Sequence, residues 1–435
     1  MAATLVQLRL PAFKSLRKAH VRLGPLTLLV GRNGSGKSNV IDAAAVLSAL
    51  ASGMTVRDAL DGGRDGPLVR GGSEGCAPVG EDVFNIGCAA KIDDKIYYLA
   101  VAISVRPSVQ IVRERLWTQR RGGPRHGEVQ DLLKTDAPRK DSGDIDARWD
   151  NRKQGPNPLV TFRATQLLTT QVATRVPATS QAGRHIHSVA EHMLAALRGI
   201  FILDPIPQQM REYVPEKDTR LRRNAENLSA VLASLMRDDG ARRALFEMTR
   251  SLSEAQVADL GVVSSDLGDV MTTIHERIGD ASYPIPARLM SDGTLRFLAI
   301  AAALLEARPV DDESAGSGPD SRLLVVEELE NGLHPSQVDL LLGRLKSAAR
   351  TGARTLATTH SPAILDALEG EDHEGVIVCS RDSDGWTQST RLTDFSDYFE
   401  VIGGGPLGTS AIRDRLRPRE HMPAQQRSLV DVLGL

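Results

Sequence analysis

Aromatic residues and cysteines are scarce in this sequence. Phe, Trp and Tyr make up 4% of 435 residues, so the core must consist mostly of Leu, Val, Ile and Ala. The three cysteines, Cys76, Cys88 and Cys379, stand far apart and form no C-x-x-C pair. This spacing argues against a disulfide scaffold and a zinc site, and we expect buried, unreactive thiols.

Long apolar runs and a strong net charge are also missing. The longest apolar stretch, residues 297–305, is much shorter than the roughly 18 residues of a membrane span, and no signal-peptide pattern is present. The formal net charge is −2, which gives no sign of a protein dominated by nucleic-acid binding. We therefore expect a cytoplasmic protein without a membrane partner.

The hydrophobic pattern predicts α/β structure at both ends of the chain. Strands at 4–10, 17–23 and 25–30 precede an Ala-rich helix at 40–50. Further on, the pattern predicts helix 293–307, strand 322–327, helix 335–350, strand 354–358, helix 362–368 and strand 375–379.

The middle of the chain is predicted to contain a meander, a long loop and helices. Strands at 83–92, 95–105 and 108–116 form the antiparallel meander, and the polar stretch 121–158 is predicted to be a long loop. Residues 160–280 are predicted to be mainly helical, with segments at 185–199, 225–236, 240–251 and 266–278. The predicted units are 1–105 and 285–395 as two halves of one nucleotide-binding domain, 106–284 as an insertion, and 396–435 as a tail.

A complete phosphate-binding loop follows the strand at 25–30. The pattern Gly31-x-x-x-x-Gly36-Lys37-Ser38 lies between a strand and a helix, as a P-loop requires. Its glycines let successive N–H groups face phosphates, and Lys37 adds a full positive charge. Ser38 is the expected magnesium ligand. The sequence thus predicts ATP and Mg²⁺ as ligands.

Two carboxylates end the apolar strand at 322–327. In a parallel sheet such a strand delivers Glu327 and Glu328 to the carboxyl edge, where ligands bind. We assign Glu327 to the magnesium side and Glu328 as the catalytic base. Solvated glutamates at a strand end are the alternative, which the upstream P-loop disfavours.

Two further polar positions are candidates for contact with the γ-phosphate. His360 follows the strand at 354–358 and can sense a γ-phosphate, or it is a plain loop histidine. Ser291 and Gly293 begin an apolar helix. Ser291 is either an N-cap or, with the free N–H groups of the helix start, an anion site for a second subunit's nucleotide.

Together these motifs resemble the ABC-type ATPase head of the structural-maintenance-of-chromosomes (SMC), RecF and OLD-like group. Phe13-Lys14-Ser15 resembles its "NFKS" element, residues 31–39 its "GxNGSGKSN" loop, and residues 291–296 its signature motif. Residues 327–335 resemble "(D/E)EPENGLHP" and residues 359–362 resemble "THSP". The implied nucleotide contacts are Lys14, Ser291, Gly293, Gly31, Arg32, Asn33, Gly34, Ser35, Gly36, Lys37, Ser38 and Asn39.

The resemblance also has departures and an undefined position. Glu327 stands where many relatives carry Asp, and Leu329 stands where Pro is usual. The insertion lacks a long heptad pattern, so a long coiled-coil arm is not expected. The group's glutamine loop implies one more metal contact, for which Gln171 is the candidate and Gln166 the alternative.

The resemblance implies a mixed central sheet, an antiparallel meander and ATP hydrolysis between two copies of the chain. Lys37, Glu328 and His360 would then do the catalytic work. The implied setting is DNA maintenance or anti-phage defence, with a nuclease or toxin effector and DNA as further candidate partners. Basic clusters such as Arg113-x-Arg115 are either DNA contacts or solvated faces. An ABC transporter subunit and an ATP-gated scaffold with little hydrolysis remain alternative functions.

Overall fold

The computed structural model describes residues 3–62, 69–119, 127–136, 143–252, 256–306, 322–350, 352–412 and 416. The strands are β1 (Ala3–Phe13), β2 (Leu16–Arg22), β3 (Leu26–Val30), β4 (Val83–Ile92), β5 (Lys95–Ser104), β6 (Gln110–Gln119), β7 (Val129–Thr135), β8 (Asp144–Trp149), β9 (Leu159–Arg163), β10 (Ile200–Leu203), β11 (Val214–Pro215), β12 (Gln256–Ser264), β13 (Asp269–Ile278), β14 (Ala281–Pro286), β15 (Leu323–Val326), β16 (Arg354–Thr359), β17 (Val376–Arg381) and β18 (Thr387–Arg391). The α-helices are α1 (Lys37–Ala51), α2 (Val56–Asp61), α3 (Leu168–Arg175), α4 (Gln181–Arg198), α5 (Pro207–Met210), α6 (Leu228–Leu235), α7 (Asp239–Leu252), α8 (Asp292–Glu306), α9 (Pro335–Arg350), α10 (Pro362–Asp366), α11 (Tyr398–Gly403) and α12 (Leu407–Ile412).

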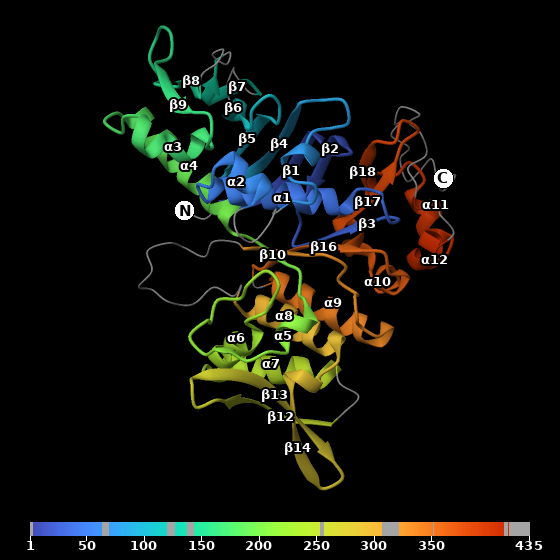
Figure 1. Ribbon diagram of the computed structural model, residues 1–435. Helices are drawn as coiled ribbons and strands as arrows, with labels where there is room; N and C mark the ends of the chain where they lie inside the picture. The colour runs from blue at the N-terminus through green and yellow to red at the C-terminus, as the bar shows by residue number, and fades with distance from the viewer. Residues whose placement is uncertain are drawn as a thin grey trace.

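One large mixed sheet organises the molecule. Its order is β10-β15-β16-β3-β17-β18-β2-β1-β4-β5-β6-β7-β8-β9, so segments from both ends of the chain alternate in it. The strands from β10 to β17 run parallel, and those from β2 to β9 are antiparallel. The antiparallel strands lie at one end of the molecule and the small sheet β11–β14 at the other (Figure 1).

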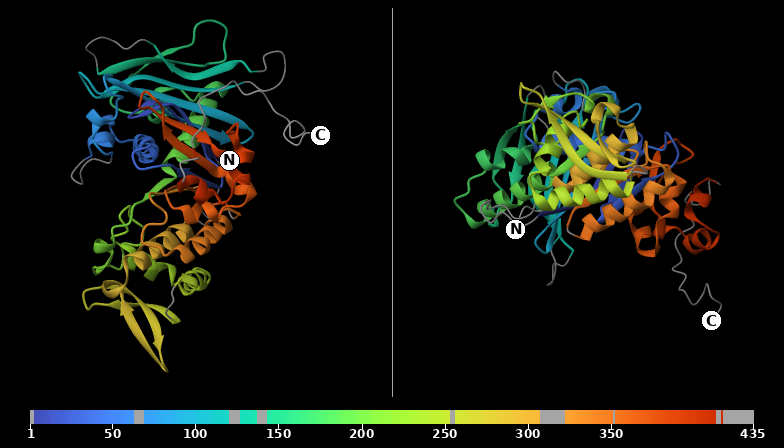
Figure 2. Two further views of the ribbon diagram at one scale, coloured as in Figure 1. Left: turned by 90° about the vertical axis from the view of Figure 1, so that its right-hand side faces the viewer. Right: turned by 90° about the horizontal axis from the view of Figure 1, so that it is seen from below.

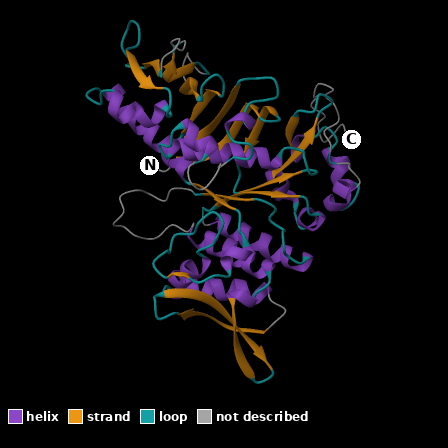
Figure 3. Ribbon diagram, viewed as in Figure 1, coloured by secondary structure: helices purple, strands orange, loops and turns teal. Residues whose placement is uncertain are grey.

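The parallel strands are covered on both faces, which is why β10 and β15 are entirely apolar and why the threonines of β16 are buried. Successive residues of β3 enter different cores: Leu29 packs with α1 and α4, whereas Leu28 and Val30 pack with α8 and α9. Figure 3 shows these helices on opposite sides of the parallel strands. The period of two along a strand therefore divides the interior into two hydrophobic clusters.

The antiparallel strands bury one face only. Residues paired directly across neighbouring strands share a face, and one such row is fully apolar and buried. The row consists of Val21, Leu8, Cys88, Leu99, Leu116, Leu133 and Trp149. It faces the cluster that contains α1 and α4, and the left view of Figure 2 shows these strands as a layer beside the helices.

Most predicted elements of the nucleotide-binding halves are confirmed within a few residues. The predicted helices at 185–199, 225–236 and 240–251 correspond to α4, α6 and α7. The three cysteines are free and buried, and burial raises the pKa of each thiol to about 12. Among the described residues, none of the helices combines the length and apolar character needed to cross a membrane.

Two secondary-structure predictions are wrong. Residues 266–278 form a turn and strand β13, not a helix, because β-branched residues fill the strand between left-handed glycines Gly268 (φ 83°) and Gly279 (φ 63°). Within the predicted loop 121–158, β7 and β8 extend the meander, with Leu133 and Trp149 paired in the core. Residues 120–126 and 137–142 lie outside the described residues.

The middle segment also contributes to the main sheet. The meander runs past residue 105 through β6 to β9 without a break, and β10 pairs in parallel with β15. The middle segment is therefore less helical than expected. The division at 105, 284 and 395 stays a prediction.

Glu114 gives the meander a buried titratable group. Its carboxylate accepts hydrogen bonds from the Leu168 and Thr169 N–H groups, both at 2.7 Å, and from Thr169 Oγ1 at 2.6 Å. It thereby caps the start of α3. Burial raises the pKa of Glu114 to about 7, against the opposing effect of these donors.

We expect Glu114→Gln to change how stability depends on pH. Because the pKa is higher in the folded than in the unfolded protein, the contribution of Glu114 is full below about pH 4.5 and is lost as pH rises through 7. Relative to the variant, the wild type should lose up to about 3 kcal/mol of unfolding free energy across that window. Urea denaturation at several pH values measures this. Glu247→Gln on exposed α7 is the control, and a pH-independent difference for Glu114→Gln would contradict the prediction.

Candidate functional site

Three neighbouring parallel strands end at one edge of the sheet. Val326 at the end of β15 pairs with Ala357, and Thr359 at the end of β16 pairs with Val30 at the end of β3. The acidic pair, the histidine and the P-loop follow these strands directly in the sequence. The fold therefore brings together the three motifs, as expected for the carboxyl edge of a parallel sheet.

Lys37 is held inside the P-loop by backbone oxygens. Its Nζ donates to the Gly31 carbonyl at 2.5 Å and to the Arg32 carbonyl at 3.1 Å. Gly34 (φ 78°) and Gly36 (φ 97°) supply the left-handed turns that fold the loop around it. Burial lowers the pKa of Lys37, although nearby acids oppose this. Among the described residues no carboxylate forms an ion pair with Lys37, so its charge is available to a phosphate.

The loop is fixed from outside by β17 and β18. Arg381 Nε donates to the Gly34 carbonyl at 2.8 Å, and Thr387 Oγ1 donates to the Ser35 carbonyl at 2.9 Å. A Cβ at Gly36 would stand 2.2 Å from Thr387 Oγ1, so only glycine fits there. Contacts from β17 and β18 thus position the phosphate loop.

A second set of contacts joins the loop to the β1–β2 turn. Asn39 Nδ2 donates to Ser15 Oγ at 2.8 Å, and the hydroxyls of Ser15 and Thr387 lie 2.8 Å apart. Asn39, a predicted nucleotide contact, therefore joins the start of α1 to the β1–β2 turn. Arg32, Asn33 and Gly34 are exposed at the loop tip.

A cavity of about 750 Å³ opens beside the loop. Its lining includes the loop residues from Gly31 to Ser35, together with His360, Pro362, Cys379, Arg381, Ala411 and Leu416. The cavity is large enough for part of a nucleotide. It also brings Ala411 and Leu416 next to the loop, which sequence patterns gave no reason to expect.

The two glutamates point to different partners. Glu327 accepts a hydrogen bond from the Ser38 hydroxyl, which joins the predicted metal-side residues directly. Glu328 is exposed, and Asn331 Nδ2 donates to its Oε2 at 3.3 Å. The Glu328 backbone is left-handed (φ 51°), an unfavourable conformation of order 1 kcal/mol for a non-glycine residue, and its N–H donates to Thr358 Oγ1 at 2.8 Å. The fold thus leaves the Glu328 side chain accessible to solvent, with Asn331 as its hydrogen-bond partner.

His360 lines the cavity and is fixed by a third glutamate. The backbone N–H of His360 donates to Glu330 Oε1 at 2.8 Å, and the ring Nδ1 lies 3.2 Å from the same oxygen. Half of the His360 side chain is exposed. The structure therefore places His360 beside the P-loop, with one ring nitrogen near Glu330.

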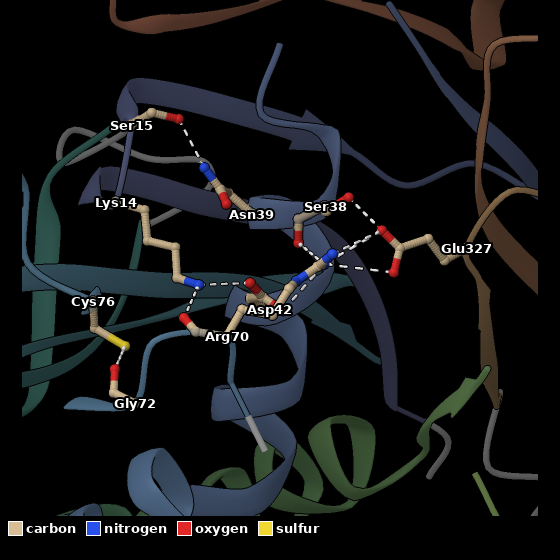
Figure 4. A network of polar contacts seen from close by, with 9 residues as sticks. All are labelled: Lys14, Ser15, Ser38, Asn39, Asp42, Arg70, Gly72, Cys76 and Glu327. Atoms are coloured by element: carbon tan, nitrogen blue, oxygen red, sulfur yellow. Dashed lines mark hydrogen bonds and ion pairs between the residues drawn. The ribbon is translucent and has the colours of Figure 1, made fainter. Parts of the chain in front are cut away.

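Arg70 and Asp42 are site residues that the sequence motifs did not reveal. Arg70 Nη1 lies 3.2 Å from Glu327 Oε1, and Nη2 lies 3.4 Å from both the Ser38 carbonyl and Asp42 Oδ1. Figure 4 shows the guanidinium between the two carboxylates. Burial lowers the pKa of Arg70, but Asp42 and Glu327 raise it overall. Arg70 lies in a Gly-rich stretch and Asp42 inside a helix, so neither carried a local signal.

Lys14 belongs to the same network. Its Nζ donates to Asp42 Oδ2 and to the Arg70 carbonyl, both at 2.7 Å (Figure 4). The side chain of Asp42 is 3% exposed, so this buried acid is paired with two cations. Lys14 is therefore linked to Ser38 through Arg70, because Lys14 contacts the Arg70 carbonyl and the Arg70 guanidinium contacts the Ser38 carbonyl.

Ser291 and Gly293 lie in a different layer from the P-loop. Ser291 Oγ accepts the Thr294 N–H at 3.1 Å, which confirms the N-cap interpretation. Gly293 packs against Gly332, where an added Cβ would stand 1.9 Å from the Gly332 carbonyl oxygen. Helix α8 lies with α5 and α9 on the far side of the parallel strands (Figure 1). The γ-phosphate role of both residues stays a prediction.

Gln171 is not placed beside the other metal candidates. Its Oε1 accepts the Arg163 N–H at 3.0 Å, and its Nε2 donates to the Arg163 carbonyl at 3.0 Å. Gln166 Nε2 donates to the Gly53 carbonyl at 3.0 Å. Both glutamines stabilise local backbone in this conformation, and a metal contact from either stays a prediction.

The residues present suit a nucleotide with magnesium. The Ser38 hydroxyl and the Glu327 carboxylate are hard oxygen ligands already in contact, which Mg²⁺ prefers. The described residues contain no group of three or more His, Cys, Asp or Glu that could hold a metal alone. A Mg²⁺ ion held by Ser38 and Glu327 would take its remaining ligands from phosphate and water.

These features define an α/β P-loop nucleotide-binding protein. The sequence matches the family described as "AAA domain, putative AbiEii toxin, Type IV TA system" over residues 26–156 and 160–366, more than half of its length. The chain belongs to this family. The resemblance to SMC- and RecF-like P-loop ATPases is thereby confirmed at the level of the family.

Individual relatives are more distant. The chain is 41% identical over 78 residues to "DNA replication and repair protein RecF" of Acidothermus cellulolyticus, which is 18% of this chain and 19% of that protein. The match thus spans about a fifth of the curated relative.

Solved SMC heads share only a loose overall similarity. An SMC head bound to the C-winged helix domain of ScpA is 12% identical, with a TM-score of 0.47 over 89% of this chain and 97% of that one. The SMC head domain from Thermotoga maritima is 12% identical, with a TM-score of 0.41 over 89% and 98%. The fold assignment rests on the strand order and the site described above.

We expect Arg70→Ala to lower the Mg²⁺ concentration needed for nucleotide binding. The Arg70 guanidinium neutralises Glu327 beside Ser38, so its removal leaves a more negative pair of oxygen ligands. The half-maximal Mg²⁺ concentration should fall about fivefold, equivalent to about 1 kcal/mol for a partly exposed ion pair. Mg²⁺ titration of fluorescent ATP-analogue binding measures this, with Arg242→Ala on α7 as the control. A higher Mg²⁺ requirement in Arg70→Ala would instead make Arg70 a ligand-supporting residue.

Proposed function

We propose that this chain binds ATP with Mg²⁺ and hydrolyses it. The observation that carries the proposal is the contact of Ser38 with Glu327 next to Lys37, whose partners in the described part of the chain are backbone carbonyls. A buried lysine whose ammonium group contacts carbonyl oxygens has no counter-charge from them, and a triphosphate supplies one. Family membership supports the same assignment.

Each residue of the proposed site has a distinct task. Lys37 and the loop N–H groups bind the phosphates, and Ser38 with Glu327 would hold Mg²⁺. The metal, when bound, offsets phosphate charge. Glu328 is exposed and oriented by Asn331, so it can take a proton from an attacking water. His360 lines the cavity beside the loop and can report whether the terminal phosphate is present.

The proposed catalytic unit is a pair of chains. Ser291 and Gly293 lie in the layer of α8, apart from the P-loop of their own chain, so a second copy would have to present them to the nucleotide. Two copies would bind ATP between them and separate after hydrolysis, a ligand-driven shift of population.

We place this ATPase in DNA maintenance or anti-phage defence, with a nuclease or toxin as effector. The RecF match supports a role in DNA maintenance. The toxin and the type IV system named in the family description support a role in anti-phage defence. An ABC transporter subunit would instead co-purify with a membrane protein. An ATP-gated scaffold would show little turnover, although both carboxylates that hydrolysis needs are present in this chain.

We expect Glu328→Gln to trap an ATP-bound dimer. The amide cannot accept the proton of the attacking water, while Lys37, Ser38 and Glu327 still bind Mg²⁺ and ATP. Turnover should fall at least about a hundredfold, the usual worth of a general base. Multi-angle light scattering with ATP and Mg²⁺ should show twice the monomer mass.

Two comparison variants define the controls. Lys37→Ala should bind ATP weakly and stay monomeric, whereas Glu247→Gln, an exposed glutamate on α7, should behave as wild type. A Glu328→Gln protein that binds ATP and stays monomeric would refute the two-chain site. Equal turnover in wild type and Lys37→Ala would refute ATP hydrolysis at this loop.

A further inference from the structure

The solvent-facing side of the antiparallel strands carries a row of positive charges. The pairing register runs from β2 to β8 through directly opposed residues, which lie on the same face of the sheet. Five residues of this register line form what we name the basic row: His20, Arg9, Arg115, Lys134 and Arg148. No acidic residue stands in the same register line.

The buried face explains why this row points outward. The neighbouring register line contains only apolar or sulfur-bearing residues, including Leu8, Leu99 and Leu133, and every member is buried. Because side chains alternate along a strand, the adjacent line must face away from that core. His20, Lys134 and Arg148 are exposed, and Arg9 and Arg115 are half-buried.

The centre of the row is shallow. Between Arg9 and Arg115 the register passes through Gly87, which has no side chain, and Ala100, which has a small one. No bulky group of this register line therefore stands between the two arginines. Seven strands with six spacings of about 4.8 Å make the row about 29 Å long. One strand of B-form DNA places about eight phosphates along that length.

An aromatic pair orients the two central arginines. Tyr98 and Trp117 stack with ring centroids 5.3 Å apart. Arg9 lies over both rings, at 5.2 and 5.7 Å from the centroids, and Arg115 lies 5.0 Å from the Trp117 centroid. A guanidinium over an aromatic ring can still donate its N–H groups to phosphate oxygens. Among these N–H groups, Nε of Arg115 already donates to Asp131.

Charge compensation differs along the row. Towards β8, Asp131 contacts Arg115 at 2.5 Å and Asp136 contacts Arg148 at 3.1 Å. Towards β2, no carboxylate among the described residues pairs with Arg9 or His20. Burial lowers the pKa of His20, and so do Arg9 and Arg22, which is the effect of a locally positive field.

We propose that the basic row is a binding surface for nucleic acid, whose phosphate backbone lies across the strands from β2 to β8. A polyphosphate chain matches a long, narrow line of guanidinium and ammonium groups with interleaved aromatic rings. The surface adds a partner to the proposed ATPase and needs neither ATP nor metal to act.

An acidic protein fits this surface less well. Protein interfaces centre on buried aromatic or apolar anchors. The aromatic rings on this face, Tyr98 and Trp117, are half-buried and have arginine guanidiniums over them. The large exposed apolar side chains on these described strands are Val129 and Leu159 at strand starts. The surface thus presents a line of charge that suits a polyanion, whereas the rings that could anchor a protein partner already contact arginines.

The test removes two charges from the row and two from elsewhere. Arg9→Gln/Lys134→Gln alters the row, and Arg243→Gln/Arg288→Gln removes the same charge from exposed positions on α7 and before α8. Binding of labelled 30-base-pair DNA, single-stranded DNA and RNA is followed by fluorescence anisotropy, in EDTA and without ATP. For duplex DNA, the row variant should bind at least tenfold more weakly, and its slope of log affinity against log salt should be smaller by about 2.

Every outcome decides the proposal. The control variant should stay within twofold of wild type, and Lys134→Glu, on an exposed side chain, should weaken binding if Arg9→Gln disturbs the aromatic stack. Equal losses in row and control variants, no loss in either, or no nucleic-acid binding by wild type would overturn it. Competition by poly-glutamate as strong as by DNA would identify an acidic protein instead and also overturn it. Because these assays contain no ATP, their failure is separate from a failure of the ATPase proposal, which Lys37→Ala turnover tests.

Discussion

The contact between Ser38 and Glu327 is the interaction on which the rest of the site depends. The two residues are 289 positions apart in the sequence, and they meet because β3 and β15 are separated by β16 alone in a parallel sheet. Two oxygen ligands in contact beside a buried lysine define where a metal and a phosphate chain would meet. The cavity, which His360 lines, opens on the other residues of the same loop, from Gly31 to Ser35.

Charge around this contact is balanced in two different ways. Arg70 and Lys14 neutralise the nearly buried Asp42, and Arg70 also contacts Glu327, so the acids on the α1 side are paired. Lys37 has carbonyl partners instead of a carboxylate, and burial lowers its pKa. The result is a site in which the negative groups have cationic or hydrogen-bonding partners and the loop lysine contacts carbonyls in place of an anion. An incoming nucleotide would satisfy the group that the fold leaves without a counter-charge.

Side chains alternate between the two faces of a strand, and this alternation places charged residues on the surface as well as apolar residues in the core. Along the antiparallel strands one register line is buried and apolar, and the next one carries the basic row. A single-residue slip in any of these strands would exchange the two lines and bury arginine, so the hydrophobic core fixes the register of the surface charges as well. The overall charge of −2 conceals this row, since acids elsewhere cancel it.

The sequence alone determined the nucleotide loop, the acid pair, the histidine and most elements of the two nucleotide-binding halves. These signals are local: a loop pattern between strand and helix, or an apolar strand ending in polar residues, has the same meaning wherever it lies in the chain. Strand β13 was mistaken for a helix because a short apolar run does not distinguish the two periods, and here pairing on both sides selects the strand.

Only the tertiary structure decided which distant residues meet. Arg70 and Asp42 reach the site through packing of a Gly-rich loop on α1, and Ser291 lies at the start of α8, in a different layer from the P-loop. The basic row requires the register of seven strands spread over residues 9–148, which no local pattern specifies. Strand pairing is set by the burial of a whole face of the sheet, and that is a property of the assembled core and not of any one segment.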